Sequence, residues 1–315
     1  MAVDTKRSAK RRRADKDDTR NDSPLFCTGK VEYYVRSWQE IFGLDMRCCR
    51  MDEQATYSVT VASIARIRDE DILLGRHGIP RSVTILDGMA CVGGDSLSFM
   101  YHFSDGLVIS NESDPVRHRF LTHNLDLVRQ QLGRRCAAQS TRLGSVLDMW
   151  GDSDGGINIA DASLSSFRKC DALYLDPEWG GTGYRDAGRS LHMEISGKPL
   201  DACVCDAFRA SRRLRWVLLK LPCNFDREHI SRILDSDDSQ RLQLSALTVG
   251  ASTARGGLNV SSYRILVRGE EKMIFVVIER VDSQAASREG PNTAEKWRQS
   301  LPTDVNLTTK RKFSR

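Results

Sequence analysis

The residues best suited to chemistry form one run, Asp176-Pro177-Glu178-Trp179, after the apolar stretch Asp171–Asp176 that predicts a buried strand. The exocyclic amine of a purine is a weak nucleophile because its lone pair is delocalised into the ring. An acceptor such as Asp176, or a carbonyl near Pro177, would localise that lone pair by taking an N–H. Trp179 offers a flat face for stacking a base, an interaction worth roughly 1–3 kcal/mol. The run therefore predicts group transfer to a nucleobase amine, with Asp176, Pro177 and Trp179 as catalytic residues.

A second candidate site follows the first predicted strand, Val83–Asp87, in the turn Gly88-Met89-Ala90-Cys91-Val92-Gly93-Gly94. A strand, a glycine turn and a helix start form the nucleotide-binding unit of open α/β sheets. Glu112, about 20 residues further on, is placed to accept ribose hydroxyls. The dehydrogenase spacing Gly-x-Gly-x-x-Gly is absent, and Asp87 suits a cationic amino-acid group better than a pyrophosphate. The pattern predicts S-adenosylmethionine as the cofactor, bound by Asp87, Ala90, Cys91, Gly93, Gly94 and Glu112.

These sites need a parallel sheet to position them. Short apolar runs alternate with helical patterns, which is typical of strands joined by crossover helices. The expected strands are Val83–Asp87, Leu107–Asn111, Asp171–Asp176, Trp216–Leu221 and Lys272–Glu279. Asp114 and Pro115 suit the N-cap and first turn of a helix. The sequence predicts an α/β fold, the class I S-adenosylmethionine-dependent methyltransferase fold. This fold has a Rossmann-like, mostly parallel seven-stranded sheet, here with an N-terminal helical extension.

Charge and composition divide the chain into four parts. We expect a disordered basic tail at 1–28, a helical extension at 29–80, the methyltransferase domain at 81–281 and a second disordered basic tail at 282–315. The net charge is +5, of which residues 1–20 carry +4 and residues 296–315 carry +5, so the remainder carries −4. Tyr33, Tyr34, Trp38, Ile41 and Phe42 form an apolar stripe that we interpret as packing.

Composition also excludes some classes. No apolar run approaches the ~20 residues of a membrane span, and no signal-peptide core is present, so we expect no membrane partner. The nine cysteines contain no Cys-x-x-Cys pair, which predicts free thiols and no metal site. The basic run Lys10–Arg13 indicates either a nuclear address or a solubilising tail, with the cytoplasm as the alternative location.

The motifs resemble one family, the RNA cap guanine-N2 methyltransferases (trimethylguanosine synthases). The similarity covers about residues 30–250 in four blocks. Tyr57-Ser58-Val59-Thr60 resembles the family's aromatic-Ser-Val-Thr segment, and Asp87–Gly94 resembles its D-x-x-C-G-V-G-G turn. Glu112-Ser113-Asp114-Pro115 is similar to D-x-D-P. Asp176–Gly181 and Leu221-Pro222-Cys223-Asn224 are similar to S-P-P-W-G-G and L-P-R-N.

The resemblance implies roles for further residues. Trp179 would stack on the 7-methylguanine of a capped RNA, and Asn224 would shape the same pocket. Tyr57, Ser58 and Thr60 would close over the cofactor and the cap. Asp114 would belong to the cofactor site, and Asp148 would bind the adenine amine unless Gly144-Ser145 occupies that place. The implied reaction is methyl transfer to guanine N2 without a metal, giving a hypermethylated cap. The sequence does not indicate any protein partner.

Two departures from the family pattern keep alternatives open. Cys91 stands where the family has a glycine, and Glu178 replaces its second proline. One alternative is therefore an RNA-binding or scaffold protein that retains the fold without activity. Another is a methyltransferase on a different nucleic-acid amine, such as adenine N6 or an rRNA guanine.

Overall fold

The structure is a computed structural model that describes residues 29–150, 166–186, 190–235, 257–267, 269–281 and 303–306. Its main strands are β1 (Thr84–Asp87), β2 (Leu107–Glu112), β3 (Ala138–Leu143), β4 (Ala172–Leu175), β7 (Trp216–Leu221), β8 (Gly257–Val267), β9 (Glu270–Val281) and β10 (Thr303–Asn306). A separate small hairpin joins β5 (Glu194–Ile195) to β6 (Lys198–Pro199).

Helices precede the first strand and lie between later strands. The N-terminal extension contains α1 (Gly29–Phe42), α2 (Ala55–Ser58), α3 (Ala62–Arg66) and the π-helix η2 (Ile67–Arg76). The longer helices that follow are α4 (Gly94–His102), α5 (Pro115–Leu132), α7 (Leu200–Ala210) and α8 (Glu228–Asp235). Short 3₁₀ turns are η3 (Gly133–Arg135), η4 (Leu147–Met149) and η5 (Gly181–Asp186).

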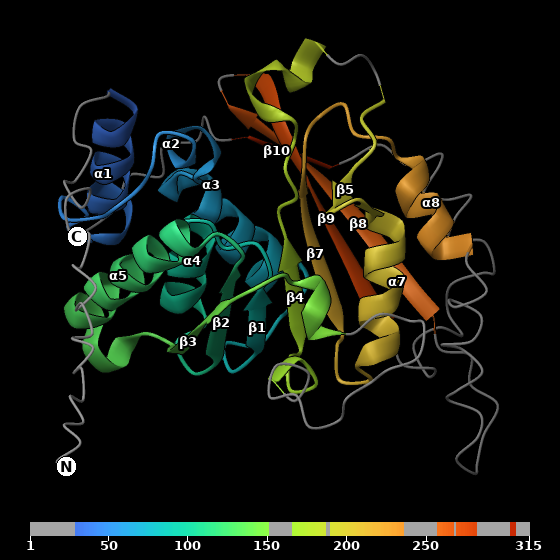
Figure 1. Ribbon diagram of the computed structural model, residues 1–315, viewed down its shortest axis with the longest axis horizontal. Coiled ribbons are helices and arrows are strands. Elements are labelled where there is room, and N and C mark those ends of the chain that lie inside the picture. The colour runs from blue at the N-terminus through green and yellow to red at the C-terminus, as the bar shows by residue number, and fades with distance from the viewer. Residues whose placement is uncertain are drawn as a thin grey trace, which may run out of the picture.

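The eight main strands form one sheet in the order β10-β8-β9-β7-β4-β1-β2-β3 (Figure 1). β1, β2, β3, β4 and β7 run parallel, and β9 lies antiparallel between β7 and β8. This order confirms the predicted mostly parallel, Rossmann-like sheet. The structure corrects one detail, because β10 pairs with the outer edge of β8 as an eighth strand.

The helix signal at Asp114 is confirmed. Its carboxylate accepts hydrogen bonds of 2.8 Å from the backbone N–H groups of Val116 and Arg117, and Pro115 is the first residue of α5. These contacts satisfy N–H groups that have no partner inside the helix. The same turn fixes where Glu112, at the end of β2, lies relative to α5.

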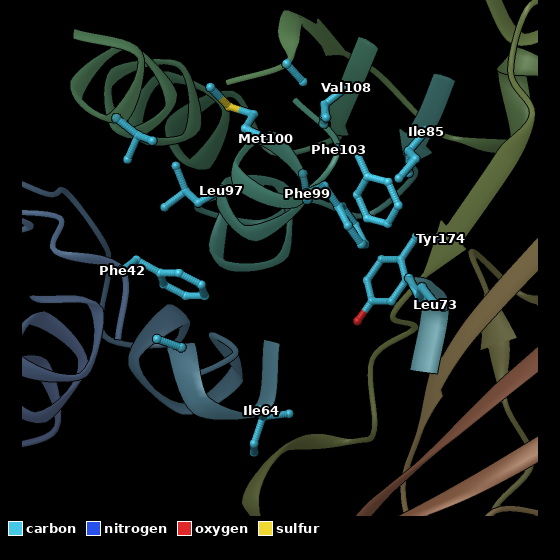
Figure 2. Close-up of a cluster of buried hydrophobic side chains, with 14 of the residues drawn as sticks. Phe42, Ile64, Leu73, Ile85, Leu97, Phe99, Met100, Phe103, Val108 and Tyr174 are labelled. Atoms are coloured by element: carbon cyan, nitrogen blue, oxygen red, sulfur yellow. The ribbon is translucent and has the colours of Figure 1, made fainter. Parts of the chain in front are cut away.

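Each face of the sheet has its own core, because successive strand residues point to opposite sides. On β4, Tyr174 faces the side covered by α4, α5 and the N-terminal extension, whereas Leu173 faces the side covered by α7 and α8. Figure 2 shows part of the first core, in which Phe99 of α4 packs against Phe103 and edge-on against Tyr174. We call these the extension face and the α7 face.

The extension is part of the extension-face core. Trp38 is fully buried, and Tyr34 and Phe42 of the same helix are buried beside it, so the packing interpretation of this stripe is confirmed for these three residues. Tyr33 departs from it, because 48% of its surface is exposed. Further along, Val59 and Thr60 press on Gly94, where a Cβ would come within 2.6 Å of a Val59 methyl carbon.

The structure also corrects the expectation for the C-terminal tail. Thr303–Asn306 lie within the segment predicted to be disordered, yet they form β10. The basic runs at 10–13 and 310–312 and the predicted N-terminal tail lie outside the described residues. Among those described, all eight cysteines are free, as predicted. None of the described helices is both long and apolar enough to cross a membrane.

Candidate active site

The site is built where β1, β4 and β7 end. In the sheet Asp87 pairs with Tyr174, and Leu175 pairs with Leu219. One residue further, Asp176 therefore lies opposite Lys220. The alternation along each strand places Asp87, Asp176 and Lys220 on the extension face, in line with buried Ile85, Tyr174 and Leu218. In open α/β sheets, ligands bind at this carboxyl edge.

Lys220 is the residue that joins the parts of this site. Its ammonium group donates hydrogen bonds to Asp176 Oδ2 at 2.6 Å, to Thr60 Oγ1 at 2.8 Å and to the carbonyl of Ser58 at 3.4 Å. Only 4% of the Lys220 side chain is exposed. The extension, the end of β4 and the end of β7 therefore meet at a single buried cation.

A second buried cation lies behind the first. Asp95 of α4 accepts a hydrogen bond from Thr60 at 2.8 Å and also one from Arg68. Arg68 is 1% exposed, makes two further bonds to Asp69 and stacks over the Phe99 ring with its guanidinium 4.1 Å from the ring centre. The charges of Asp95 and Asp69 are thus compensated inside the extension-face core, where a carboxylate without a cation would cost stability.

Asp87 is different, because none of the described cationic side chains pairs with it. Its Oδ2 accepts a 2.6 Å hydrogen bond from Ser96, whereas its buried Oδ1 has no hydrogen-bond partner among the described residues. Burial, together with the nearby charge of Asp95, raises the pKa of Asp87 to about 7. Burial also raises the pKa of Asp176, although Lys220 opposes this shift. For Lys220 burial acts to lower the pKa, but Asp176 and Asp95 outweigh it and the pKa is raised.

The glycine turn after β1 adopts a strained conformation at Cys91, whose φ of 51° lies in the left-handed region. The Cys91 N–H donates a 2.8 Å hydrogen bond to Glu112 Oε2, and its sulfur lies 3.8 Å from Ser58 Oγ. Gly93, with φ of 100°, precedes α4. The bond to Glu112 therefore holds the backbone of Cys91 in this conformation, and its side chain brings the turn into contact with the extension.

The remaining predicted cofactor residues differ in burial and in the contacts that they make. Ala90 and Glu112 are buried at the turn, and the second Glu112 oxygen accepts the N–H of Asp114 at 2.8 Å. Asp114 acts as the helix cap described above, and Asp148 is exposed on η4. Gly144, the alternative to Asp148, donates its N–H to the Glu112 carbonyl at 3.0 Å and so lies directly beside the β2 end. Gly94 is covered by Val59 and Thr60.

Trp179 lies at the junction of the two cores and is half-buried. Its ring meets Tyr184 nearly edge-on, with the ring centres 5.1 Å apart, and the Lys220 ammonium lies 5.7 Å from its centre. Asn224 holds this region from the β7 side by donating to the Tyr184 carbonyl at 2.9 Å. Glu178 is exposed.

Tyr57 lies apart from these contacts. It is 56% exposed, and the Lys30 ammonium lies 3.2 Å from the centre of its ring. It borders an open hollow of about 340 Å³, which is lined by Lys30, Tyr33, Tyr34, Thr56, Tyr57, Val59 and Val61. The structure therefore brings Ser58, Thr60, Cys91, Asp176 and Trp179 together through Lys220, with Tyr57 on the outer side of the same segment.

Several residues of the site were missed from the sequence. Lys220, Arg68 and Asp95 carry most of its buried charge, and none of them belongs to a motif. One signal existed, because a lysine inside the apolar run Trp216–Leu221 must find a partner if the strand is buried. Arg68 offered no such signal, because it lies in an amphipathic segment among other charged residues. Asp95 offered none either, because an acidic residue in the first turn of a helix is common.

Comparisons with known proteins bear on the fold. No family model matches the chain. An uncharacterised protein of Acanthamoeba polyphaga mimivirus, L320, is 23% identical over 169 residues, which are 54% of this chain and 57% of L320. A solved structure of a candidate methyltransferase from Porphyromonas gingivalis superposes with a TM-score of 0.51 at 14% identity, covering 85% of this chain and 51% of that one. The chain thus spans little more than half the length of either protein.

A human methyltransferase 10 domain protein gives a lower TM-score of 0.44 at 10% identity, over 79% of this chain and 95% of that one. Together with the strand order, the Porphyromonas structure establishes the class I S-adenosylmethionine-dependent methyltransferase fold. S-adenosylmethionine is the cofactor that this fold implies. The residues present fit it, because the unpaired Oδ1 of buried Asp87 needs a donor or cation.

Proposed function

We propose that the chain is an S-adenosylmethionine-dependent methyltransferase that methylates the exocyclic N2 of guanine in RNA, with the 7-methylguanosine cap as its substrate. One observation carries the proposal: half-buried Asp176 and buried Lys220 form a pair that lies beside Trp179, at the sheet edge that also holds Asp87. The fold supports methyl transfer. The choice of RNA cap rests on the motif resemblance and on Trp179.

The cofactor would be held by Asp87, the turn Cys91–Gly93 and Glu112. When bound, it supplies an electrophilic methyl group on a sulfonium sulfur. Asp87 Oδ1 would accept from the amino group of its methionine part. Each Glu112 oxygen accepts one backbone N–H, and a carboxylate oxygen can accept more than one hydrogen bond, so both can also take ribose hydroxyls.

Asp176 would orient and deprotonate the amine. Lys220 donates to Oδ2, which leaves Oδ1 to accept an N–H from the guanine N2. Because burial raises the pKa of Asp176, this carboxylate is a stronger base than a surface aspartate. It can therefore take the proton that the amine loses as it gains the methyl group, and release that proton to solvent after product departs.

Trp179 would orient the guanine base by stacking against it. Lys220 lies near the Trp179 ring, and Tyr184 meets the ring nearly edge-on, so the guanine would stack on a remaining free part of the ring. Asn224 would keep Tyr184 in place through its carbonyl. The hollow lined by three tyrosines and Lys30 offers a second place where an aromatic base and a phosphate of the RNA can bind.

A second candidate is a methyltransferase on an uncharged purine amine. The observation that favours it is the distance of 5.7 Å between the Lys220 ammonium and the Trp179 ring centre. A cation already near the ring weakens the extra attraction that a positively charged 7-methylguanine would gain there. A neutral guanine or adenine has no such attraction to lose, so the Lys220 cation would not weaken its stacking on Trp179.

Methyl transfer to matched RNAs tests the proposal. The full chain is incubated with S-adenosylmethionine and one transcript, either 7-methylguanosine-capped or uncapped, and methylated nucleosides are identified by mass spectrometry. We expect N2-methylated product from capped RNA. Trp179→Ala should raise KM by about 5- to 150-fold, as stacking worth roughly 1–3 kcal/mol implies. Its S-adenosylmethionine affinity, measured by calorimetry, should not change.

The other outcomes separate the alternatives. Equal transfer to capped and uncapped RNA would support the second candidate, and methylation at adenine would do the same. No binding of S-adenosylmethionine by the wild-type chain would contradict both and leave a scaffold role. For the cellular location we propose the nucleus on the basic run Lys10–Arg13.

A further inference from the structure

We propose that His192, Asp226 and His229 form a binding site for a divalent transition-metal ion, with Zn²⁺ as the ion that the ligand set fits best. The site lies on the α7 face and is separate from the methyl-transfer residues, so the proposal does not rest on the proposed function. The metal ligands offered are one nitrogen from each histidine and one oxygen from Asp226, and all three atoms lie within 4.8 Å of one another.

The spacing of the three atoms suits a tetrahedral ion. His192 Nδ1 lies 3.4 Å from Asp226 Oδ2. Two ligands at the usual zinc bond lengths and a tetrahedral angle lie about 3.4 Å apart, so these two atoms are already at the required separation. The His192 and His229 rings meet nearly edge-on, with their centres 5.5 Å apart. A small rotation of exposed His192 completes the triangle.

The contacts of His229 favour Nε2 as its metal-binding nitrogen. Its Nε2 lies 3.3 Å from the backbone N–H of Met193, which can only donate, so Nε2 is the unprotonated nitrogen. Nδ1 then carries the hydrogen and donates to Asp201 Oδ1 at 3.0 Å. Arg232 binds Asp201 Oδ2 at 2.6 Å, and its second nitrogen lies 2.9 Å from the same Nδ1. Because both groups donate in this tautomer, that approach is a close contact and not a hydrogen bond. The long Met193 contact is weak and is readily given up to a metal ion.

Asp201 supplies the second observation. Histidines that bind metals almost always donate their other ring N–H to a carboxylate or carbonyl, which fixes the ring and strengthens the ligand nitrogen. His229 is 3% exposed and has this arrangement, with Asp201 itself held by Arg232. An ordinary buried histidine needs only one such partner, whereas here a ring nitrogen of His229 also lies within 4.8 Å of ligand atoms of His192 and Asp226.

The site would fasten two segments of the chain. His192 follows Leu191, which pairs with Phe225 through the bonds Leu191 N–H to Asn224 and Asp226 N–H to Leu191. Asp226 and His229 lie at the start of α8. A metal ion would therefore lock the segment before β5 to the loop after β7. The fourth ligand would be water, because 66% of the His192 side chain is exposed.

Metal titration of the full chain tests the site. After dialysis against a chelator, Zn²⁺ and Co²⁺ are titrated by competition with a chromophoric chelator. We expect one tight site, which His192→Ala weakens at least tenfold. Because His192 is mostly exposed, this change should leave the thermal unfolding of the metal-free chain unaltered. The Co²⁺ complex should show d–d absorption bands without a thiolate charge-transfer band.

Two further variants separate a built site from adventitious binding. Asp201→Asn should weaken Zn²⁺ binding about 10- to 100-fold, since it removes the carboxylate that orients His229. His123→Ala, on α5 across the sheet, is the matched control and should bind as the wild type does. The proposal is overturned by the absence of a tight site, by unchanged affinity in His192→Ala, or by a thiolate band showing that cysteines bind the ion.

Discussion

The two faces of the sheet differ in what the same strands present to them. On the α7 face the buried residues of β4 and β7 are all apolar: Leu173, Leu175, Val217, Leu219 and Leu221. On the extension face the same strands end in Asp176 and Lys220, and Arg68 and Asp95 complete a buried ionic network behind them. β4 and β7 therefore each contribute to an apolar core on one face of the sheet and to a charged site on the other.

The difference indicates which face carries function. Replacing a buried ion pair by apolar residues is often neutral or stabilising, so a network of this kind is not needed for folding. The uncompensated carboxyl of Asp87 costs stability outright in the absence of a ligand. Stability thus comes mainly from the α7 face and from the aromatic core under the network, whereas the polar edge of the extension face is organised for a cationic ligand.

Among the variants that test the difference between the two faces, removal of Lys220 should have the largest effect on stability and activity. Lys220→Met should lower the free energy of unfolding by about 3–5 kcal/mol at pH 8, because it leaves Asp176 without its cation in a buried site. It should also abolish methyl transfer. The pKa of Asp176 is already raised and rises further without Lys220, so acidification protonates the carboxyl and the loss should shrink between pH 8 and pH 5. Urea unfolding at several pH values measures this.

The matched control is Leu219→Ala, the neighbouring residue on the α7 face. It should cost about 2–5 kcal/mol through lost burial and a cavity, and that loss should not depend on pH. If both variants showed the same pH profile, the distinction between a charged face and an apolar face would be broken.

Asp87→Asn should act in the opposite direction on stability. The pKa of Asp87 is about 7 in the folded chain against an unfolded value of 3.8, so the folded state binds the extra proton between these values. Wild-type stability therefore falls as pH rises from about 4 to about 7. Without cofactor, the variant should be more stable than the wild type by up to about 4 kcal/mol at pH 8 and equal to it at pH 4.

The same variant should bind S-adenosylmethionine more weakly, which calorimetry at pH 8 measures. A gain in stability combined with a loss of cofactor affinity would sharpen the assignment of Asp87 to the ligand. Unchanged affinity would mean that the amino group of the cofactor lies elsewhere, and destabilisation at pH 8 would show that Ser96 alone compensates the charge.

Much of the fold was predictable because its signals are local. β7 has the expected bounds Trp216–Leu221, and β1, β2 and β4 each differ from the expected strands by one residue at an end or both. β10 was not predictable, since Thr303–Asn306 is short, polar and stable only by pairing with β8. Its neighbours in sequence are basic and resemble a tail.

The site was predictable only where a motif carried it. Asp87, Glu112 and Asp176 follow from their places at strand ends. Lys220 could have been suspected from its run, but its partners could not, because Thr60 is 160 residues away and Asp176 is 44 residues away along the chain. The approach of Val59 of the extension to Gly94 could not be predicted for the same reason.

The smallest expected effect concerns Tyr174, which lies under the network with a buried hydroxyl that has no hydrogen-bond partner among the described residues. Tyr174→Phe removes this unsatisfied group and keeps the ring that packs against Phe99, so unfolding free energy should stay equal or rise by up to about 1 kcal/mol. Thermal and urea unfolding of the cofactor-free chain measure the change. A loss of more than about 1 kcal/mol would mean that the hydroxyl interacts favourably with the charges of Asp95 and Arg68. Tyr174 would then belong to the charged site as well as to the aromatic core.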